Sequence, residues 1–196
     1  MAERVAVLDY GNLDFIDRAK ASSNVELTRL IVGLFVTTTD ENGEFCVVLQ
    51  RRSKHKKEFP DCLTFLVSGH VDEQDMYHVF ALPQTLLEAL TDTALLRESF
   101  EEIGITIEKF DETRCFDSEI RENNIPAKQM HIKTICIDRS VLGELRYNPE
   151  EVDGIEVVPL KKIIEQIKLS PEEREAGFEF TTPFEEFMRL VFNKLL

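Results

Sequence analysis

Three glutamates, Glu98, Glu101 and Glu102, have the type and spacing required for a metal-dependent reaction. Residues at positions i, i+3 and i+4 fall on one face of an α-helix, so their carboxylates would lie close together. Like charges at this spacing destabilise a helix unless a cation or an arginine compensates them. Clusters of oxygen ligands suit Mg²⁺ or Mn²⁺. The alternative is an ordinary solvated acidic helix surface.

The element that must position these glutamates is a helix that we expect to begin after Pro83 and to end near Ile103. Gly104 follows directly and is a natural stop for a helix. On the side opposite the glutamates, a row of apolar and small residues is expected to anchor the helix to the core. The row consists of Ala89, Thr93, Leu96, Phe100 and Ile103.

The rest of the chain reads as strands before and after this helix, followed by further helices. Runs of β-branched and apolar residues predict strands at 28–38, 45–51, 62–67, 106–110, 113–119, 130–137 and 155–159. Helices are expected at 15–22, at 160–167 and from Thr182 onward. This order predicts an α/β fold, with a mixed β-sheet flanked by helices. Residues 1–26 are expected to form an N-terminal annex packed on a domain of residues 27–196.

Composition excludes several classes of partner. The chain has 196 residues, of which 43% are hydrophobic and 31% charged, which is typical of a soluble globular domain. A formal net charge of −14 repels phosphate backbones, so nucleic acid is not an expected partner. The four cysteines form no CxxC pair, which disfavours a zinc site. The start lacks a signal-peptide pattern and the apolar stretch 30–36 is too short to span a bilayer, so we expect a cytoplasmic protein with no membrane association.

Residues 97–105, RESFEEIGI, resemble the core of the Nudix box, whose pattern is G-x5-E-x7-REUxEExGU with U a bulky apolar residue. Arg97, the three glutamates, Gly104 and Ile105 match in register, and only Ser99 departs from the first U. Upstream, residues 69–75, GHVDEQD, are similar to G-x5-E, with Asp75 in place of the glutamate. Between Asp75 and Arg97 lie 21 residues where the pattern has 7, which predicts an insertion of 14 residues.

The flanking runs 49–71 and 148–163 resemble the branch that includes the isopentenyl-diphosphate isomerases and their hydrolase cousins. The isomerases have a cysteine directly before the Gly-His pair, where this chain has Ser68. Their Glu-x-Glu strand signature would fall near 129–131, and this chain lacks it. The resemblance therefore favours a hydrolase over an isomerase.

The resemblance implies a Nudix-type α/β/α sandwich and a pyrophosphohydrolase that cleaves a nucleoside diphosphate derivative or a related organic pyrophosphate. It implies Mg²⁺ or Mn²⁺ as cofactor, held by Glu98, Glu101, Glu102 and the backbone carbonyl of Gly69. Catalytic roles fall to Glu98 and Glu101, with Glu98 or an acid outside the box as general base. Arg97 would orient a carboxylate of the box.

Outside the box, the basic loop residues Arg51, Arg52 and Lys57 are expected to bind substrate phosphate, the alternative being a solvated loop. Glu150 or Glu151 is a candidate for an extra base. The expected partner is a small-molecule diphosphate, and a homodimer is suggested by analogy with the family alone. Two other functions stay open: an isomerase of prenyl diphosphates and a non-catalytic Nudix-fold binding module.

Overall fold

The computed structural model describes residues 3–9, 12–24, 26–78, 85–107, 116–120 and 128–192. The chain divides into two compact units. The first unit comprises Met1–Gly33, Ser68–Glu98 and Arg114–Lys133, and the second comprises Leu34–Val67, Ser99–Thr113 and Thr134–Leu196. Strands β3 (Thr28–Thr39) and β8 (Lys128–Cys136) and helix α2 (Leu86–Ile103) contribute residues to both.

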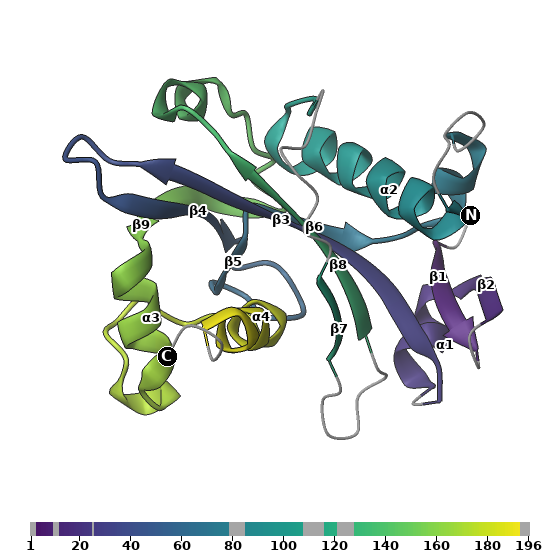
Figure 1. The fold of residues 1–196 in the computed structure, drawn as a ribbon. Helices are drawn as coiled ribbons and strands as arrows, with labels where there is room; N and C mark the ends of the chain where they lie inside the picture. The colour runs from purple at the N-terminus through teal and green to yellow at the C-terminus, as the bar shows by residue number, and fades with distance from the viewer. Residues whose placement is uncertain are drawn as a thin grey trace. The chain divides into compact units, whose positions relative to one another are not determined.

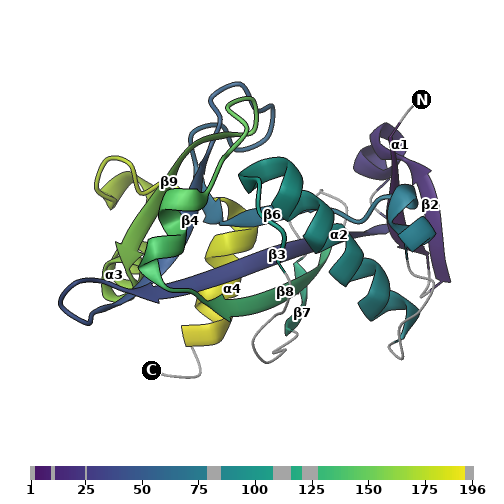
Figure 2. The ribbon, with the colours of Figure 1, turned by 90° about the horizontal axis from the view of Figure 1, so that it is seen from above.

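An antiparallel hairpin opens the first unit. Strands β1 (Arg4–Asp9) and β2 (Asn12–Asp17) pair along their whole length, and the short helix α1 (Arg18–Ser23) lies beside them (Figure 2). The prediction of a helix from residue 15 was wrong at its start. Asp17 is the N-cap, since its side chain accepts a hydrogen bond from the backbone N–H of Ala19, and the strand continues up to it. β1 also pairs with β3 through Val7 and Arg29; the division of the chain at residue 26 stays a prediction.

The segment around Gly69 is held by the same strands. β6 (Val67–His70) pairs with β3 and is followed by the 3₁₀ helix η1 (Glu73–His78). Between them, the Val71 carbonyl accepts a hydrogen bond from the Ala6 N–H at 2.7 Å, and the Val71 N–H donates to the Leu30 carbonyl at 3.1 Å. These bonds from two different strands fix the backbone that leads from Gly69 toward Asp75.

Helix α2 begins and ends at sequence signals. Thr85 and Glu88 form reciprocal hydrogen bonds at its start, the arrangement of a capping box. Gly104 follows the last turn with a φ of +69°, so the predicted stop is confirmed. In the second unit, the carbonyls of Glu102 and Ile103 accept hydrogen bonds from the backbone N–H groups of Asn148 and Arg146. The loop at 146–148 therefore satisfies two carbonyls that a free helix end would leave open.

The predicted anchoring face of α2 was wrong in part: Ala89 and Ile103 are buried as predicted, but two other residues of the row are not. Phe100 is 66% exposed and Leu96 is also exposed. The other buried residues lie around Glu102, which is itself 4% exposed; they include Leu90, Ala94, Leu95 and Ser99. Apolar residues occur on both sides of this helix, and the prediction assigned the core to the side without the glutamates. The glutamate face of α2 is in fact turned inward at Glu102.

In the second unit, β4 (Phe45–Arg52) is the central strand. β9 (Val152–Pro159) pairs along one edge of it, while the end of β3 and then β5 (Leu63–Phe65) pair along the other, all antiparallel. The predicted strands at 28–38 and 45–51 form the antiparallel pair β3 and β4, and in the turn between them the Asp40 side chain accepts hydrogen bonds from the Asn42 and Glu44 N–H groups.

Helices α3 (Leu160–Lys168) and α4 (Thr182–Phe192) lie together against the strands of the second unit (Figure 1). Phe184 and Phe187 of α4 pack on Phe65 of β5, with ring centroids 5.2 and 5.4 Å apart. Aromatic pairs at this separation bury large apolar areas and fix the helix on the sheet.

The remaining elements are β7 (Phe116–Ile120), which pairs with β8, and the 3₁₀ helices η2 (Arg139–Glu144) and η3 (Pro171–Glu173). Ile105–Ile107 do not form the predicted strand at 106–110, whose last residues lie outside the described part. The fold is the predicted α/β class, a mixed sheet with flanking helices. Among the described residues, no helix combines the length and apolar character needed to cross a membrane.

Candidate active site

Arg97 ties the two halves of the motif together in the first unit. Its Nε donates to Asp75 Oδ1 at 2.9 Å and its Nη2 to Asp75 Oδ2 at 3.1 Å. Its Nη1 donates to Glu98 Oε1 at 2.9 Å, and Nη2 also donates to the His70 carbonyl at 2.9 Å. A planar guanidinium suits this forked arrangement because it presents several N–H donors in fixed directions. Asp75 thus keeps the contact with Arg97 despite its shorter side chain and the 21 residues between them.

Burial and charge both shape this cluster. Asp75 is 1% exposed, and its Oδ2 also accepts a hydrogen bond from the Asp72 N–H at 2.8 Å. Burial by itself lowers the pKa of Arg97, but hydrogen bonding to Asp75 and the charges of Glu98, Asp75 and Asp72 outweigh it and raise that pKa above its usual value. Arg97 is therefore a permanent cation that compensates several carboxylates.

Asp72 behaves differently from Asp75. Burial raises the pKa of Asp72 from 3.8 to about 6, although Arg97, whose Nη2 lies 3.6 Å from Asp72 Oδ2, acts to lower it. The folded protein therefore holds the Asp72 proton more tightly than the unfolded chain does. Stability from this group is present at low pH and is lost as the pH rises from about 4 to above 6.

A test of this pH effect compares the protein with its Asp72→Asn variant. The variant has no carboxyl proton to lose, so its free energy of unfolding should fall less between pH 4.5 and pH 7.5. Between these pH values, the free energy of unfolding should fall further in the unaltered protein than in the variant, by on the order of 1–3 kcal/mol. Urea unfolding at several pH values measures it, and equal falls in the two proteins would contradict the assignment.

Gly69 lies directly against the Glu98 side chain. A Cβ placed on Gly69 would lie 2.0 Å from Glu98 Oε1 and 2.1 Å from its carboxyl carbon. No real Cβ contact is that short, so only glycine lets the β6 backbone approach this carboxylate. The structure thus brings the predicted metal-binding residues Gly69 and Glu98 together within the first unit.

Replacing Gly69 with Ala is expected to displace the Glu98 carboxylate from Arg97. The added methyl group overlaps the carboxylate, so either Glu98 or the β6 backbone must shift, at a cost of about 1–3 kcal/mol. Urea unfolding measures the loss. The control is Gly143→Ala in η2, because nothing lies within 4 Å of a Cβ there. Equal stabilities of the two variants would show that the contact at Gly69 does not constrain the backbone.

In the second unit, Glu102 is buried and accepts a side-chain hydrogen bond, while Glu101 is exposed. Gln50 of β4 donates from Nε2 to Glu102 Oε2 at 3.3 Å. Burying a carboxylate is costly unless it is hydrogen-bonded, paired or bound to a cation. Gln50 supplies such a hydrogen bond to Glu102.

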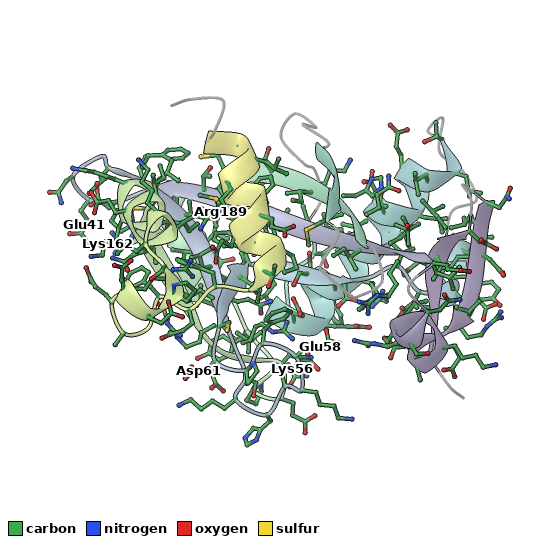
Figure 3. All side chains as sticks on the ribbon, turned by 90° about the horizontal axis from the view of Figure 1, so that it is seen from below. Glu41, Lys56, Glu58, Asp61, Lys162 and Arg189 are labelled. Atoms are coloured by element: carbon green, nitrogen blue, oxygen red, sulfur yellow. The ribbon has the colours of Figure 1, made fainter. Side chains whose placement is uncertain are left out.

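The two arginines after Gln50 brace a loop of the second unit. Arg51 pairs with Glu156 at 2.6 Å and donates to the carbonyls of Asp61 and Gly177. Arg52 donates to the carbonyls of Glu58 and Phe59. Figure 3 labels Lys56, Glu58 and Asp61 on this loop.

The loop that these arginines hold has an unusual backbone. Phe59 and Asp61 have φ values of +50° and +60°, which side-chain-bearing residues rarely adopt and which need support from their surroundings. The guanidinium groups of Arg51 and Arg52 supply that support. A role for either in phosphate binding stays a prediction, and the exposed Lys57 is the predicted phosphate-binding residue whose side chain faces solvent.

Glu150 and Glu151 lie on a loop that docks at the end of α2 through the Asn148 N–H. The Glu151 carboxylate pairs with Lys56, and the Glu151 carbonyl accepts a hydrogen bond from the Ser53 N–H at 2.9 Å. Glu150 is exposed, and its N–H donates to the Asn148 side chain at 3.1 Å. Of the two candidates, Glu150 is the one whose side chain is exposed to solvent.

The donor types of the motif fit a hard divalent cation, since Glu98, Glu101 and Glu102 offer carboxylate oxygens and Gly69 a backbone carbonyl. Across the described part of the chain, however, no three His, Cys, Asp or Glu side chains are gathered into a ready metal site. Arg97 donates a hydrogen bond to Glu98 and Gln50 donates one to Glu102.

Two residues of these clusters were missed by sequence reasoning. Asp72 occupies a variable position of the motif, and nothing in the pattern marks it. Gln50 ends an apolar run, Phe45–Leu49, and an amide in such a run is a signal that was available in the sequence.

Residues 27–180 match the family model described as NUDIX domain. The structure of DR0079 from Deinococcus radiodurans is similar, with 19% identity, a TM-score of 0.61 and coverage of 96% of this chain and 98% of that one. A Nudix hydrolase from Alicyclobacillus acidocaldarius has 14% identity, a TM-score of 0.61 and coverage of 83% and 90%.

A third similar structure is the Nudix domain of Shewanella oneidensis NrtR in complex with ADP ribose. It has 14% identity and a TM-score of 0.55, and the alignment covers 86% of this chain and 89% of that one. At these identities the similarity concerns the fold. No curated protein sequence matches the chain. The family model covers most of the chain, and the Arg97 cluster joins the two halves of the motif, so this protein belongs to the Nudix family.

Proposed function

We propose that the protein is a divalent-metal-dependent pyrophosphohydrolase that cleaves a diphosphate linkage in a nucleoside diphosphate derivative or a related organic pyrophosphate. The observation that carries the proposal is the Arg97 fork, which joins Asp75 and the His70 carbonyl to Glu98. The chain has this charged cluster and all three glutamates of the motif, which are the groups that the proposed hydrolysis requires. The hydrolase cousins of the isomerase branch remain the proposed relatives, because Ser68 stands where the isomerases have cysteine.

In this proposal helix α2 carries the ligands Glu98, Glu101 and Glu102, and β6 adds the Gly69 carbonyl. These residues would hold a divalent cation, which when bound would lower the pKa of water and neutralise charge on the phosphates. Arg97 fixes the rotamer of Glu98 and compensates the negative charge around it. Glu98 or Glu150 takes the proton of the attacking water, and Lys57 binds a phosphate of the substrate.

The test is release of phosphate across a panel of diphosphates, with a phosphatase coupled to the reaction and with Mg²⁺ or EDTA present. The panel includes ADP-ribose, which the NrtR Nudix domain binds in its structure, and isopentenyl diphosphate. We expect Mg²⁺-dependent turnover of at least one nucleoside diphosphate derivative and none in EDTA. Absence of turnover on every diphosphate, with Mn²⁺ shown to be bound, would overturn the hydrolase proposal.

The same panel separates the two other functions. An isomerase converts isopentenyl diphosphate to its double-bond isomer without releasing phosphate, which proton NMR detects. A non-catalytic module binds ADP-ribose without turnover, which calorimetry detects. The predicted homodimer and the cytoplasmic location are separate proposals that this panel does not address.

A further inference from the structure

Gln50 is a buried amide in a strand whose neighbouring residues are apolar. Cys46, Val47, Val48 and Leu49 of β4 are buried, and Gln50 has no exposed surface. Because side chains alternate along a strand, Val48 and Gln50 lie on one face of β4, and Leu49 lies on the other. Burial of an amide costs free energy unless it gains partners, so this position needs a reason to be polar.

The partner of this amide is a residue of the Nudix motif. Gln50 Nε2 donates to Glu102 Oε2 at 3.3 Å, and the Glu102 backbone carbonyl accepts the Asn148 N–H at 3.0 Å. Both the carboxylate and the backbone of Glu102 are thus engaged within the second unit. The other end of the amide, Gln50 Oε1, is buried and accepts no hydrogen bond from the described residues. An amide oxygen left as an acceptor beside a carboxylate attracts a cation or a water molecule.

We propose that Gln50 is a positioning residue that fixes the Glu102 carboxylate for binding of a divalent cation. The inference deepens the proposed function and rests on it. Gln50 acts through Glu102: its Nε2 donates to Oε2 and holds the rotamer of the carboxylate. Groups that orient a metal ligand in this way contribute to metal affinity although they do not touch the metal.

Binding of Mn²⁺, followed by electron paramagnetic resonance of the free ion, tests this without requiring turnover. Gln50→Met keeps the length of the side chain and removes the donor. The dissociation constant for Mn²⁺ is expected to rise about 10- to 100-fold. The matched control is Gln166→Met in α3, another buried glutamine, which bonds Glu175 through both ends of its amide. The control loses hydrogen bonds of the same kind and should bind Mn²⁺ as the unaltered protein does.

A double-mutant cycle with Glu102→Gln shows whether Gln50 acts through that residue. In the Glu102→Gln background, Gln50→Met should change Mn²⁺ affinity by less than about 2-fold, because the contact is already altered. Equal effects of Gln50→Met in both backgrounds, or an unchanged dissociation constant in the single variant, would overturn the inference. If Gln50→Met does not fold, Gln50→Asn serves instead, since it keeps an amide but is one methylene too short to reach Glu102.

The outcomes separate this inference from the proposed function. Mg²⁺-dependent hydrolysis together with unchanged Mn²⁺ binding by Gln50→Met overturns the role of Gln50 and leaves the hydrolase intact. Absence of hydrolysis, with Mn²⁺ binding weakened by Gln50→Met, overturns the hydrolase and leaves the role in metal binding. Absence of Mn²⁺ binding in the unaltered protein overturns both.

Discussion

Replacement of Glu101 by Gln is expected to lower kcat at least about 100-fold while the free energy of unfolding stays within about 0.5 kcal/mol of its original value. Glu101 is exposed on α2, so the substitution leaves the packing of the core unchanged. The amide of the variant has nearly the same shape but lacks the negative charge that a hard cation requires. A 100-fold loss corresponds to about 2.7 kcal/mol of transition-state stabilisation, a modest share of what a bound metal supplies.

Steady-state hydrolysis of the best substrate of the panel measures this effect, and urea unfolding measures stability. The control is Glu165→Gln, the same substitution at an exposed position of α3, which should leave kcat unchanged. Full activity of Glu101→Gln would remove Glu101 from the metal site. Equal losses in the two variants would show that the effect comes from the general charge of the protein.

Replacement of Arg97 by Ala is expected to destabilise the protein by about 3–5 kcal/mol. The change leaves Asp75, which is 1% exposed, without the guanidinium that pairs with it, and removes a donor from the His70 carbonyl. Removal of one partner from a buried ion pair is costly because the remaining charge cannot reach water. Arg97→Lys keeps the charge but not the fork, so we expect an intermediate loss.

Urea unfolding of each variant measures these losses. The control is Arg18→Ala, which breaks the exposed Arg18–Glu3 pair of the same unit and should cost less than about 1 kcal/mol. A combined Arg97→Ala and Asp75→Asn variant should recover part of the loss, since it removes the buried charge as well. If Arg97→Ala were no more destabilising than Arg18→Ala, the cluster would not be a structural support.

Local signals in the sequence were sufficient for much of this fold. Gly104, with its need for a positive φ, marked the end of α2, and the turn residues at 40–43 marked the first hairpin of the second unit. Arg97 and Asp75, which the motif register placed in its two halves, are in contact and complementary in charge. Fold class followed from the order of the elements.

Other features depend on contacts that no local pattern encodes. Helical periodicity groups residues into faces but does not say which face meets the sheet, so Leu96 and Phe100 were assigned to the core although they are exposed. Arg51 donates hydrogen bonds to Glu156 and to the Gly177 carbonyl, and both residues lie more than a hundred positions away in the sequence. The Gln50–Glu102 contact likewise joins two distant segments.

The Arg97–Asp75 pair also determines how much a change in the length of the chain between these two residues would cost in stability. Both ends of this connection are fixed independently, Asp75 by the Asp72 N–H and by burial, and the start of α2 by the Thr85–Glu88 capping box. The entropy lost on closing a loop grows only with the logarithm of its length, about 0.6 kcal/mol for each doubling. Lengthening the connection between Asp75 and Thr85 therefore costs far less than loss of the ion pair. Folding is thus expected to tolerate a change in the length of this connection better than the loss of either charged residue.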